Sequence, residues 1–238
     1  MMKKYIVLVL FFLVSSVAHT QIMLPAYQGV FKKIGLISGS TITFTYNGAS
    51  VTYGTVISAG RYWLDRNLGA TQVATSSTDA SAYGDLFQWG RGADGHQIRT
   101  SSTTTTLSAT DIPGNASFIK SSSNWRSAQN DNLWQGINGI INPCPSGYRI
   151  PTETEINVEI ASWSTINAAG ALASPLKLPL AGYRHYANGS LAHVGVHGRY
   201  WSTTVSGTNA RNLYDHSAAA SIASNDRAWG FSVRCIKD

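Results

Sequence analysis

Cys144 and Cys235 are the residues whose chemistry the sequence constrains most, because they are the only cysteines. They lie about 90 residues apart, in a chain that opens on a segment typical of an export signal. In an exported protein, two cysteines far apart in sequence most often pair, and we expect a disulfide between them. Over such a loop, the chain-entropy model gives a stabilisation of about 4–5 kcal/mol. The alternative is two buried free thiols.

The histidines offer no metal site by their spacing. His193 and His197 are four residues apart, which brings two ligands to one ion only on a helix. The glycines at positions 195 and 198 argue against a helix, and on a strand the same spacing is roughly 13 Å. His185 and His216 add no partner at a fixed distance. We therefore expect surface or hydrogen-bonded histidines and no metal ligand.

No set of residues predicts catalysis. A serine nucleophile of the hydrolase type sits on a strained elbow, and no Gly-x-Ser-x-Gly sequence occurs. No pairing of carboxylates of the glycosidase type is visible. Residues 90–95 match the glycine-rich dinucleotide pattern, but no helical period follows them, so we expect a plain turn. We expect no catalytic residue and no cofactor.

The seven tryptophans are many for this length. An exposed tryptophan or tyrosine is the usual platform for a sugar ring or a protein partner. Trp63 and Trp201 lie in predicted strands and Trp163 on the apolar face of a predicted helix, so they should belong to the core. Trp125 and Trp134 lie in an irregular polar region, where binding surfaces collect. They are our candidate ligand contacts.

Residues 142–156 are the segment around which the predicted elements are arranged. Prolines flank Cys144, and a short strand-like piece over residues 148–150 follows. Thr152 and Glu155 then form the signature of a capping box, which predicts a helix start. Ile156, Ile160 and Trp163 recur at helical spacing and should face inward.

Strands are predicted on both sides of this helix. Residues 41–46 alternate with period two, and Asn47-Gly48 predicts a tight hairpin to residues 51–57. Residues 61–65 and 199–204 are further strands. In the last predicted strand, residues 230–237, period two turns Cys235 toward the core. The polar tract over residues 91–123 is long for a compact domain, and we expect a mobile loop or a binding surface.

Composition bounds the fold class and the partners. Charged residues make up only 13% of the chain, which is rich in glycine and polar turn formers. This pattern of many turns and few long amphipathic helices favours a β-rich or irregular α+β domain. Of these we expect α+β, with irregular antiparallel sheets, one or two helices and long loops. The formal charge is +6, but the basic residues are scattered. We therefore expect no nucleic-acid partner.

The N-terminal residues are typical of a secretory signal peptide. A short basic start precedes an apolar run over residues 5–14 and then small residues. We expect residues 1–20 to be the signal peptide, 21–40 an N-terminal arm and 41–238 one domain. No later segment is apolar enough to span a membrane. The predicted location is secreted: periplasm, cell surface or extracellular medium.

The order of several short motifs is similar to that of a known family. The motifs are Tyr62-Trp63-Leu64-Asp65-Arg66-Asn67-Leu68, Tyr83-Gly84-Asp85-Leu86-Phe87-Gln88-Trp89, Cys144-Pro145-Ser146-Gly147-Tyr148-Arg149-Ile150-Pro151-Thr152, Leu180-Ala181-Gly182-Tyr183-Arg184, Tyr200-Trp201-Ser202-Thr203 and Gly230-Phe231-Ser232-Val233-Arg234-Cys235. From about Thr41 to Asp238, the chain resembles the Fibrobacter succinogenes major paralogous domain of secreted proteins in Bacteroidetes-type bacteria. The resemblance implies a C-type-lectin-like fold related to the formylglycine-generating (sulfatase-modifying) enzymes, with both chain ends in one sheet.

The same resemblance bears on calcium and on cysteine chemistry. Asn225 and Asp226 precede the final predicted strand, roughly where calcium-dependent lectins offer a pair of ligands, and we include them as speculative ligand-binding residues. No Glu-Pro-Asn or Gln-Pro-Asp triplet occurs, and a hard cation needs six to eight oxygens, so a capping or turn role competes with calcium. Formylglycine-generating enzymes use active-site cysteines, and a disulfide would occupy both cysteines here.

We therefore expect a non-enzymatic binding module for a polysaccharide or a surface protein. The long polar tract, the aromatic residues and the resemblance favour it. A structural component of the cell envelope is the alternative. A further alternative is an enzyme of the formylglycine-generating fold that lacks the cysteine chemistry. Such an enzyme would need a cleft with converging polar groups of perturbed pKa.

Overall fold

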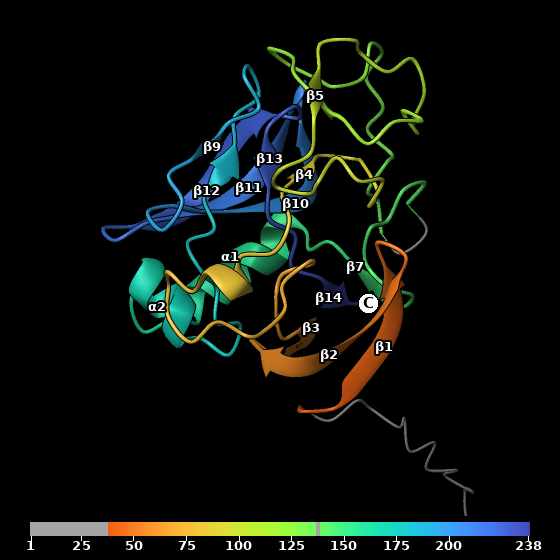
Figure 1. Cartoon of the computed structure of the whole chain (residues 1–238). Helices are drawn as coiled ribbons and strands as arrows, with labels where there is room; N and C mark the ends of the chain where they lie inside the picture. Colours follow the sequence, from red (N-terminus) through yellow and green to blue (C-terminus); the bar gives the residue numbers. More distant parts are fainter. Residues whose placement is uncertain (1–37, 137–138) are drawn as a thin grey trace, which may run out of the picture. The chain divides into compact units, whose positions relative to one another are not determined.

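The computed structural model describes residues 38–136 and 139–238, which form an α+β unit of mostly antiparallel sheets (Figure 1). The predicted signal peptide, 1–20, lies outside the described residues, as does the predicted arm except for residues 38–40. Within the described ranges, no helix combines the length and apolar character needed to cross a bilayer.

The first sheet joins the two ends of the described chain. Its strand order is β1 (Thr41–Tyr46), β2 (Ala49–Ser58), β3 (Arg61–Leu64), β14 (Ile236–Lys237) and β7 (Tyr148–Arg149). The predicted hairpin is confirmed: Asn47 and Gly48 connect β1 and β2 with φ of 50° and 77°. Ile236 pairs with both Trp63 and Arg149, so the last strand lies between β3 and β7.

Helix α1 (Glu153–Ala161) begins at the predicted capping box. The Thr152 hydroxyl accepts from the Glu155 amide, and the Glu155 carboxylate accepts from the Thr152 amide. Arg149 adds two hydrogen bonds to the same carboxylate, each 2.7 Å long. A second short helix, α2 (Ala168–Ala173), starts at Asn167, whose side chain caps the amides of Ala169 and Gly170.

Two further antiparallel sheets carry most of the C-terminal half. One consists of β10 (Gly198–Ser206), β11 (Asn209–Asp215) and β12 (Ala220–Asp226). The other has the order β4 (Phe87–Gln88), β13 (Gly230–Phe231), β8 (Tyr183–Arg184) and β9 (Leu191–Ala192). The predicted strand over residues 230–237 is therefore two short strands, β13 and β14, in different sheets. A bridge between Tyr200 and Ser232 connects β10 to the segment between them.

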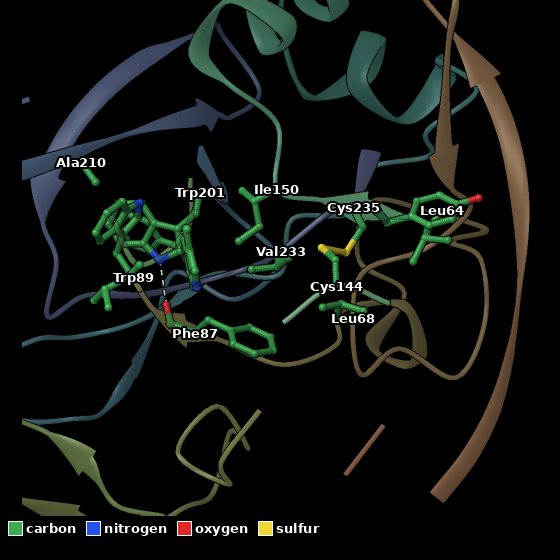
Figure 2. Packing of buried hydrophobic residues seen from close by; sticks show 14 of the residues in the cluster. Leu64, Leu68, Phe87, Trp89, Cys144, Ile150, Trp201, Ala210, Val233 and Cys235 are labelled. Carbon is green, nitrogen blue, oxygen red and sulfur yellow. Dashed lines mark hydrogen bonds between the residues drawn. A yellow bond between two sulfur atoms is a disulfide. The ribbon is translucent and has the colours of Figure 1, made fainter. Parts of the chain in front are cut away.

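The core has two clusters. In one, α1 packs between sheets, with Ile156 and Ile160 against Trp63 of β3 and against Tyr200 and Leu213 of β10 and β11. The other cluster contains the disulfide and several indoles (Figure 2). There the Trp201 indole donates to the Phe87 carbonyl at 2.7 Å, and the Trp89 indole donates to the Ser202 carbonyl at 2.9 Å. These bonds satisfy the indole N–H groups that burial removes from water.

Strand pairing and the hydrogen bonds of Arg91 anchor the polar tract over residues 91–123. A two-stranded parallel sheet joins β5 (Thr103–Thr104) to β6 (Phe118–Ile119), and a short 3-10 helix, η1 (Ala80–Ala82), precedes the tract. Arg91 is fully buried, and its guanidinium donates to Gln88, Asp94 and the carbonyls of Asn115 and Ser117. The low-complexity threonines thus lie in an anchored loop.

Candidate functional site

A continuous group of half-buried rings lies around the β8–β9 connection, the turn before β10 and the turn before β13. We call this group the aromatic surface. Its members are Tyr183, His185, Tyr186, His193, His197, Tyr214, His216 and Trp229. His193 is exposed and the other rings are partly exposed. Such rings can contact a ligand and still be fixed by their neighbours.

Trp229 is central to the aromatic surface. Of the seven tryptophans, all of which lie in the described ranges, only Trp229 is not buried. Its ring centroid lies 5.1 Å from that of Tyr183, 4.6 Å from that of His185 and 4.8 Å from that of Tyr186, with the planes steeply inclined. Its backbone N–H donates to the Asp226 carbonyl, which closes the turn that presents the indole.

Arg227 anchors the turn that carries Trp229. It is 1% exposed and donates to the Asp131 carboxylate at 2.7 Å. Its guanidinium carbon lies 4.4 Å from the centroid of the Trp89 ring, a cation–π contact. The buried Gln88 side chain donates to the next carbonyl, that of Ala228. Trp229 therefore projects from an anchored backbone, which lowers the entropy cost of ligand contact.

His193 and His197 lie side by side, which corrects the expectation that strand spacing would hold them apart. Residues 193–197 form neither helix nor strand but a turn, in which the Val196 and His197 amides both donate to the His193 carbonyl. The His193 and His197 rings stack with centroids 4.2 Å apart and planes only 3° from parallel. Burial, together with His193, Arg199 and His216, lowers the pKa of His197.

Arg199 contacts the Tyr214 ring of the aromatic surface and also donates a hydrogen bond to Asn225. The register of β10 and β11 places Arg199 opposite Tyr214, and the guanidinium carbon is 3.7 Å from the Tyr214 ring centroid. One guanidinium nitrogen donates to Asn212 and to Asn225, each at 3.1 Å. Burial lowers the pKa of Arg199. Asn225 thus supports the aromatic surface through Arg199, and Asp226 begins the Trp229 turn through its backbone.

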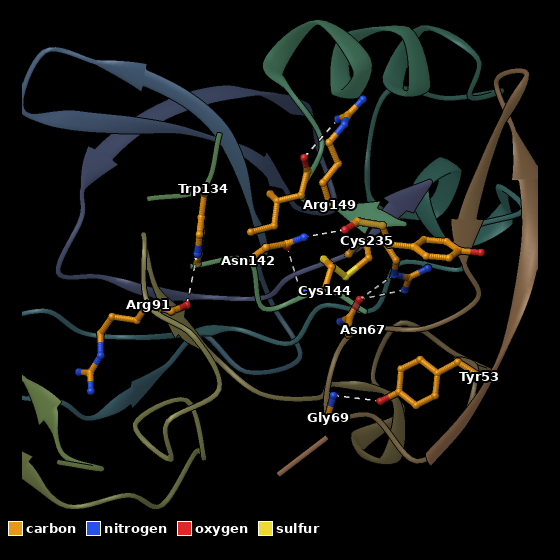
Figure 3. Close-up of a disulfide and its surroundings, with 12 residues drawn as sticks. Tyr53, Asn67, Gly69, Arg91, Trp134, Asn142, Cys144, Arg149 and Cys235 are labelled. Atoms are coloured by element: carbon orange, nitrogen blue, oxygen red, sulfur yellow. Dashed lines mark hydrogen bonds between the residues drawn. A yellow bond between two sulfur atoms is a disulfide. The ribbon is translucent and has the colours of Figure 1, made fainter. Parts of the chain in front are cut away.

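Trp125 and Trp134 are not available as ligand contacts, which corrects the prediction from the irregular region. Their exposed fractions are 0% and 1%. The Trp125 indole donates to the Trp89 carbonyl at 2.7 Å. The Trp134 indole donates to the Arg91 carbonyl (Figure 3). Both rings fill the core because the irregular region folds back over Trp89. Their sequence context is polar, and only the tertiary contacts reveal their burial.

The expected disulfide joins Cys144 to Cys235, and both residues are buried (Figure 3). Asn142 positions this segment: its side-chain Oδ1 accepts from the Cys144 amide, and its side-chain Nδ2 donates to the Tyr148 carbonyl. The bond ties the stretch before α1 to the end of the chain, and it leaves no thiol for chemistry.

The buried His96 and the half-buried Asp94 form a hydrogen-bonded pair. Nε2 of His96 accepts from the Gln88 amide at 3.0 Å, so Nδ1 carries the proton and donates to Asp94. Burial lowers the pKa of His96 to about 4, against the opposing effect of Asp94. Both ring nitrogens are therefore occupied. Across residues 38–136 and 139–238, no group of three or more His, Cys, Asp or Glu side chains could hold a metal ion.

One feature of the sequence indicates the aromatic surface. Four of the six histidines fall in the interval from His185 to His216, where tyrosines also recur. Trp229 is indistinguishable by sequence from the buried tryptophans. Comparison of the chain with protein-family models, with curated proteins and with solved structures gave no match.

Proposed function

We propose that this chain is a secreted, non-enzymatic binding module that holds a polysaccharide on the aromatic surface. The proposal rests on the exposure of Trp229, the single partly exposed indole among the seven tryptophans. The rings of Tyr183, His185 and Tyr186 surround it. The apolar face of a sugar ring packs on an indole or phenol, while the polar ring edges of tyrosine and histidine bond hydroxyl groups.

The spread of the rings favours an extended ligand. They come from the β8–β9 connection, the 193–197 turn, the end of β11 and the turn before β13, so they can contact successive units of a chain. Anchoring by Arg199 and Arg227 keeps the rings in place before binding. A preorganised surface of this kind loses little conformational entropy when it binds.

We further propose that the chain has the C-type-lectin-like fold of the Fibrobacter succinogenes major paralogous domain. Its support is the pairing of β14 with β3 and β7, which brings the end of the chain beside the first strands, as that fold requires. Location outside the cytoplasm is part of the same proposal, and the disulfide is compatible with an oxidising compartment.

Affinity electrophoresis tests the polysaccharide proposal. The folded chain is run in gels that contain neutral polymers, such as xylan, mannan and hydroxyethyl cellulose, or acidic polymers, such as pectin and alginate. We expect retardation by at least one polymer. Trp229→Ala should weaken that retardation by roughly 5- to 150-fold, because stacking of a ligand ring on an aromatic side chain contributes on the order of 1–3 kcal/mol.

The matched control is Val158→Ala, which truncates an exposed side chain on α1. It should migrate as the original chain does in every gel. Failure of all polymers to retard the chain, or full retardation of the Trp229→Ala variant, would contradict the proposal.

A protein partner is the second candidate, because aliphatic side chains lie exposed beside the rings. Leu191, Val194 and Val196 are 42%, 41% and 52% exposed on the segment that carries His193 and His197. Apolar groups of this kind contact proteins more readily than sugars. Val194→Ser should leave polysaccharide retardation unchanged and should weaken only a protein contact.

A further inference from the structure

A cavity of about 530 Å³ lies between the β1–β2 hairpin and the segments around residues 66–71, 85 and 98. None of the aromatic-surface residues lines it. The lining residues with polar groups that bear on a ligand are Tyr46, Asn47, Tyr53, Arg66 and Asp85. The volume falls in the range of small-molecule sites.

Asp85 supplies the carboxylate of this cavity. Its Oδ2 accepts from the Tyr46 hydroxyl at 2.8 Å and more weakly from Asn47 at 3.5 Å. Its Oδ1 has no hydrogen-bond partner within the described ranges. Burial raises the pKa of Asp85, against the opposing effects of Tyr46, Asn47 and Arg99. Arg99 donates to the carbonyls of Gly84 and Ala181 and forms no ion pair with Asp85.

The backbone holds Asp85 in this position. Gly69 has a φ of +83°, and a Cβ at this residue would lie 2.5 Å from Oδ2 of Asp85. The Asp85 amide donates to the Leu68 carbonyl at 2.9 Å. The carboxylate thus packs directly against the Gly69 turn, which only glycine can form without strain and collision.

The other charged residue of the cavity is already neutralised. Arg66 makes two hydrogen bonds to its neighbour Asp65, at 2.7 and 2.9 Å, and a third to the Thr71 carbonyl. Asp65 does not line the cavity. Of the two charged residues that line the cavity, Asp85 is therefore the one without a close ion-pair partner.

We propose that this cavity binds a small ligand through a primary ammonium group. The ammonium would donate to Oδ1 of Asp85, beside the Tyr46 hydroxyl that donates to Oδ2. Val51 and Ile98 supply apolar walls for a compact carbon skeleton. A cation compensates the partly buried carboxylate in a way that a neutral hydroxyl cannot, because opposite charge adds to the hydrogen bond. This site is independent of polysaccharide binding.

Amide-resolved NMR titration of the folded chain at pH 7 tests this site. The probes are cyclohexylammonium chloride, its neutral counterpart cyclohexanol, and glucose. We expect cyclohexylammonium to shift the amide signals of Asn47, Gly69 and Ala70, while cyclohexanol and glucose leave them in place. Asp85→Asn should weaken the amine affinity at least tenfold. Asp111→Asn, an equal change of charge at a carboxylate outside the cavity lining, should leave it unchanged.

A second measurement keeps the test independent of the variant's stability. In the original chain, lowering the pH far enough to protonate Asp85 should abolish amine binding while the amide spectrum remains that of a folded protein. Equal shifts with cyclohexanol would overturn the proposal, as would glucose shifts that need Asp85, amine binding by Asp85→Asn, or no shifts at all. Trp229→Ala should not affect amine binding, which separates this outcome from the polysaccharide test.

Discussion

Asp215 ends strand β11 as a fully buried carboxylate whose two oxygens have no hydrogen-bond partner among residues 38–136 and 139–238. It occupies the space left by Gly198 on the paired strand, where a Cβ would lie 2.0 Å from Oδ1. Burial raises the pKa of Asp215 from 3.8 to about 7, although Arg199 lowers it in part. The folded chain therefore favours the protonated carboxyl group.

The sign of the resulting pH dependence follows from linkage. Between about pH 4 and pH 7, the unfolded chain has released this proton while the folded chain retains it, so the free energy of unfolding falls as pH rises. Above pH 7 the loss is complete. Asp215→Asn should remove this slope and raise the stability at pH 8 by on the order of 2–4 kcal/mol.

Urea unfolding of both chains at pH 5 and pH 8 measures this effect. The variant should gain clearly more at pH 8 than at pH 5. An equal change at both pH values would contradict the prediction, because it would mean that the pKa of Asp215 is the same in the folded and the unfolded chain.

At the scale of elements, α1 depends on local chemistry at its N-terminus. Burial alone would raise the pKa of Glu155, but hydrogen bonds from Arg149 and Thr152 lower it to about 2. The carboxylate thus remains charged at the helix N-terminus, where negative charge is stabilising. The Glu153 amide donates to the Thr204 hydroxyl, which also ties this helix start to β10.

Thr152→Ala should destabilise the fold by about 1–2 kcal/mol, because it leaves the Glu155 amide without its cap. Thermal unfolding measures the loss. Thr208→Ala is the matched control, since Thr208 is exposed in the turn between β10 and β11. If both variants unfold at the same temperature as the original chain, the cap makes no contribution to stability.

For the whole molecule, the sequence predicted the features that depend on neighbouring residues. The Asn47-Gly48 hairpin and the Thr152–Glu155 cap follow from local backbone and hydrogen-bond preferences. The Cys144–Cys235 bridge and the α+β class were also correct, since cysteine number and composition restrict them. The signal peptide and the family remain predictions.

The candidate site needed information that no local pattern contains. Trp125 and Trp134 are buried because the irregular segment that carries them packs against Trp89. Trp229 is partly exposed on a turn that the buried Arg227 anchors. His193 and His197 meet because the intervening residues form a turn, which neither helical nor strand spacing describes. Burial in these cases is set by contacts between residues that are distant in sequence.

Acrylamide quenching of tryptophan fluorescence tests the central claim most directly, because Trp229 is the one indole that is not buried. The chain is measured with and without the polysaccharide that retards it most, and Trp229→Phe identifies the quenchable component. We predict that the polysaccharide protects this component from acrylamide. Bound polysaccharide that leaves the quenching of Trp229 unchanged would contradict the assignment of the aromatic surface as the binding site.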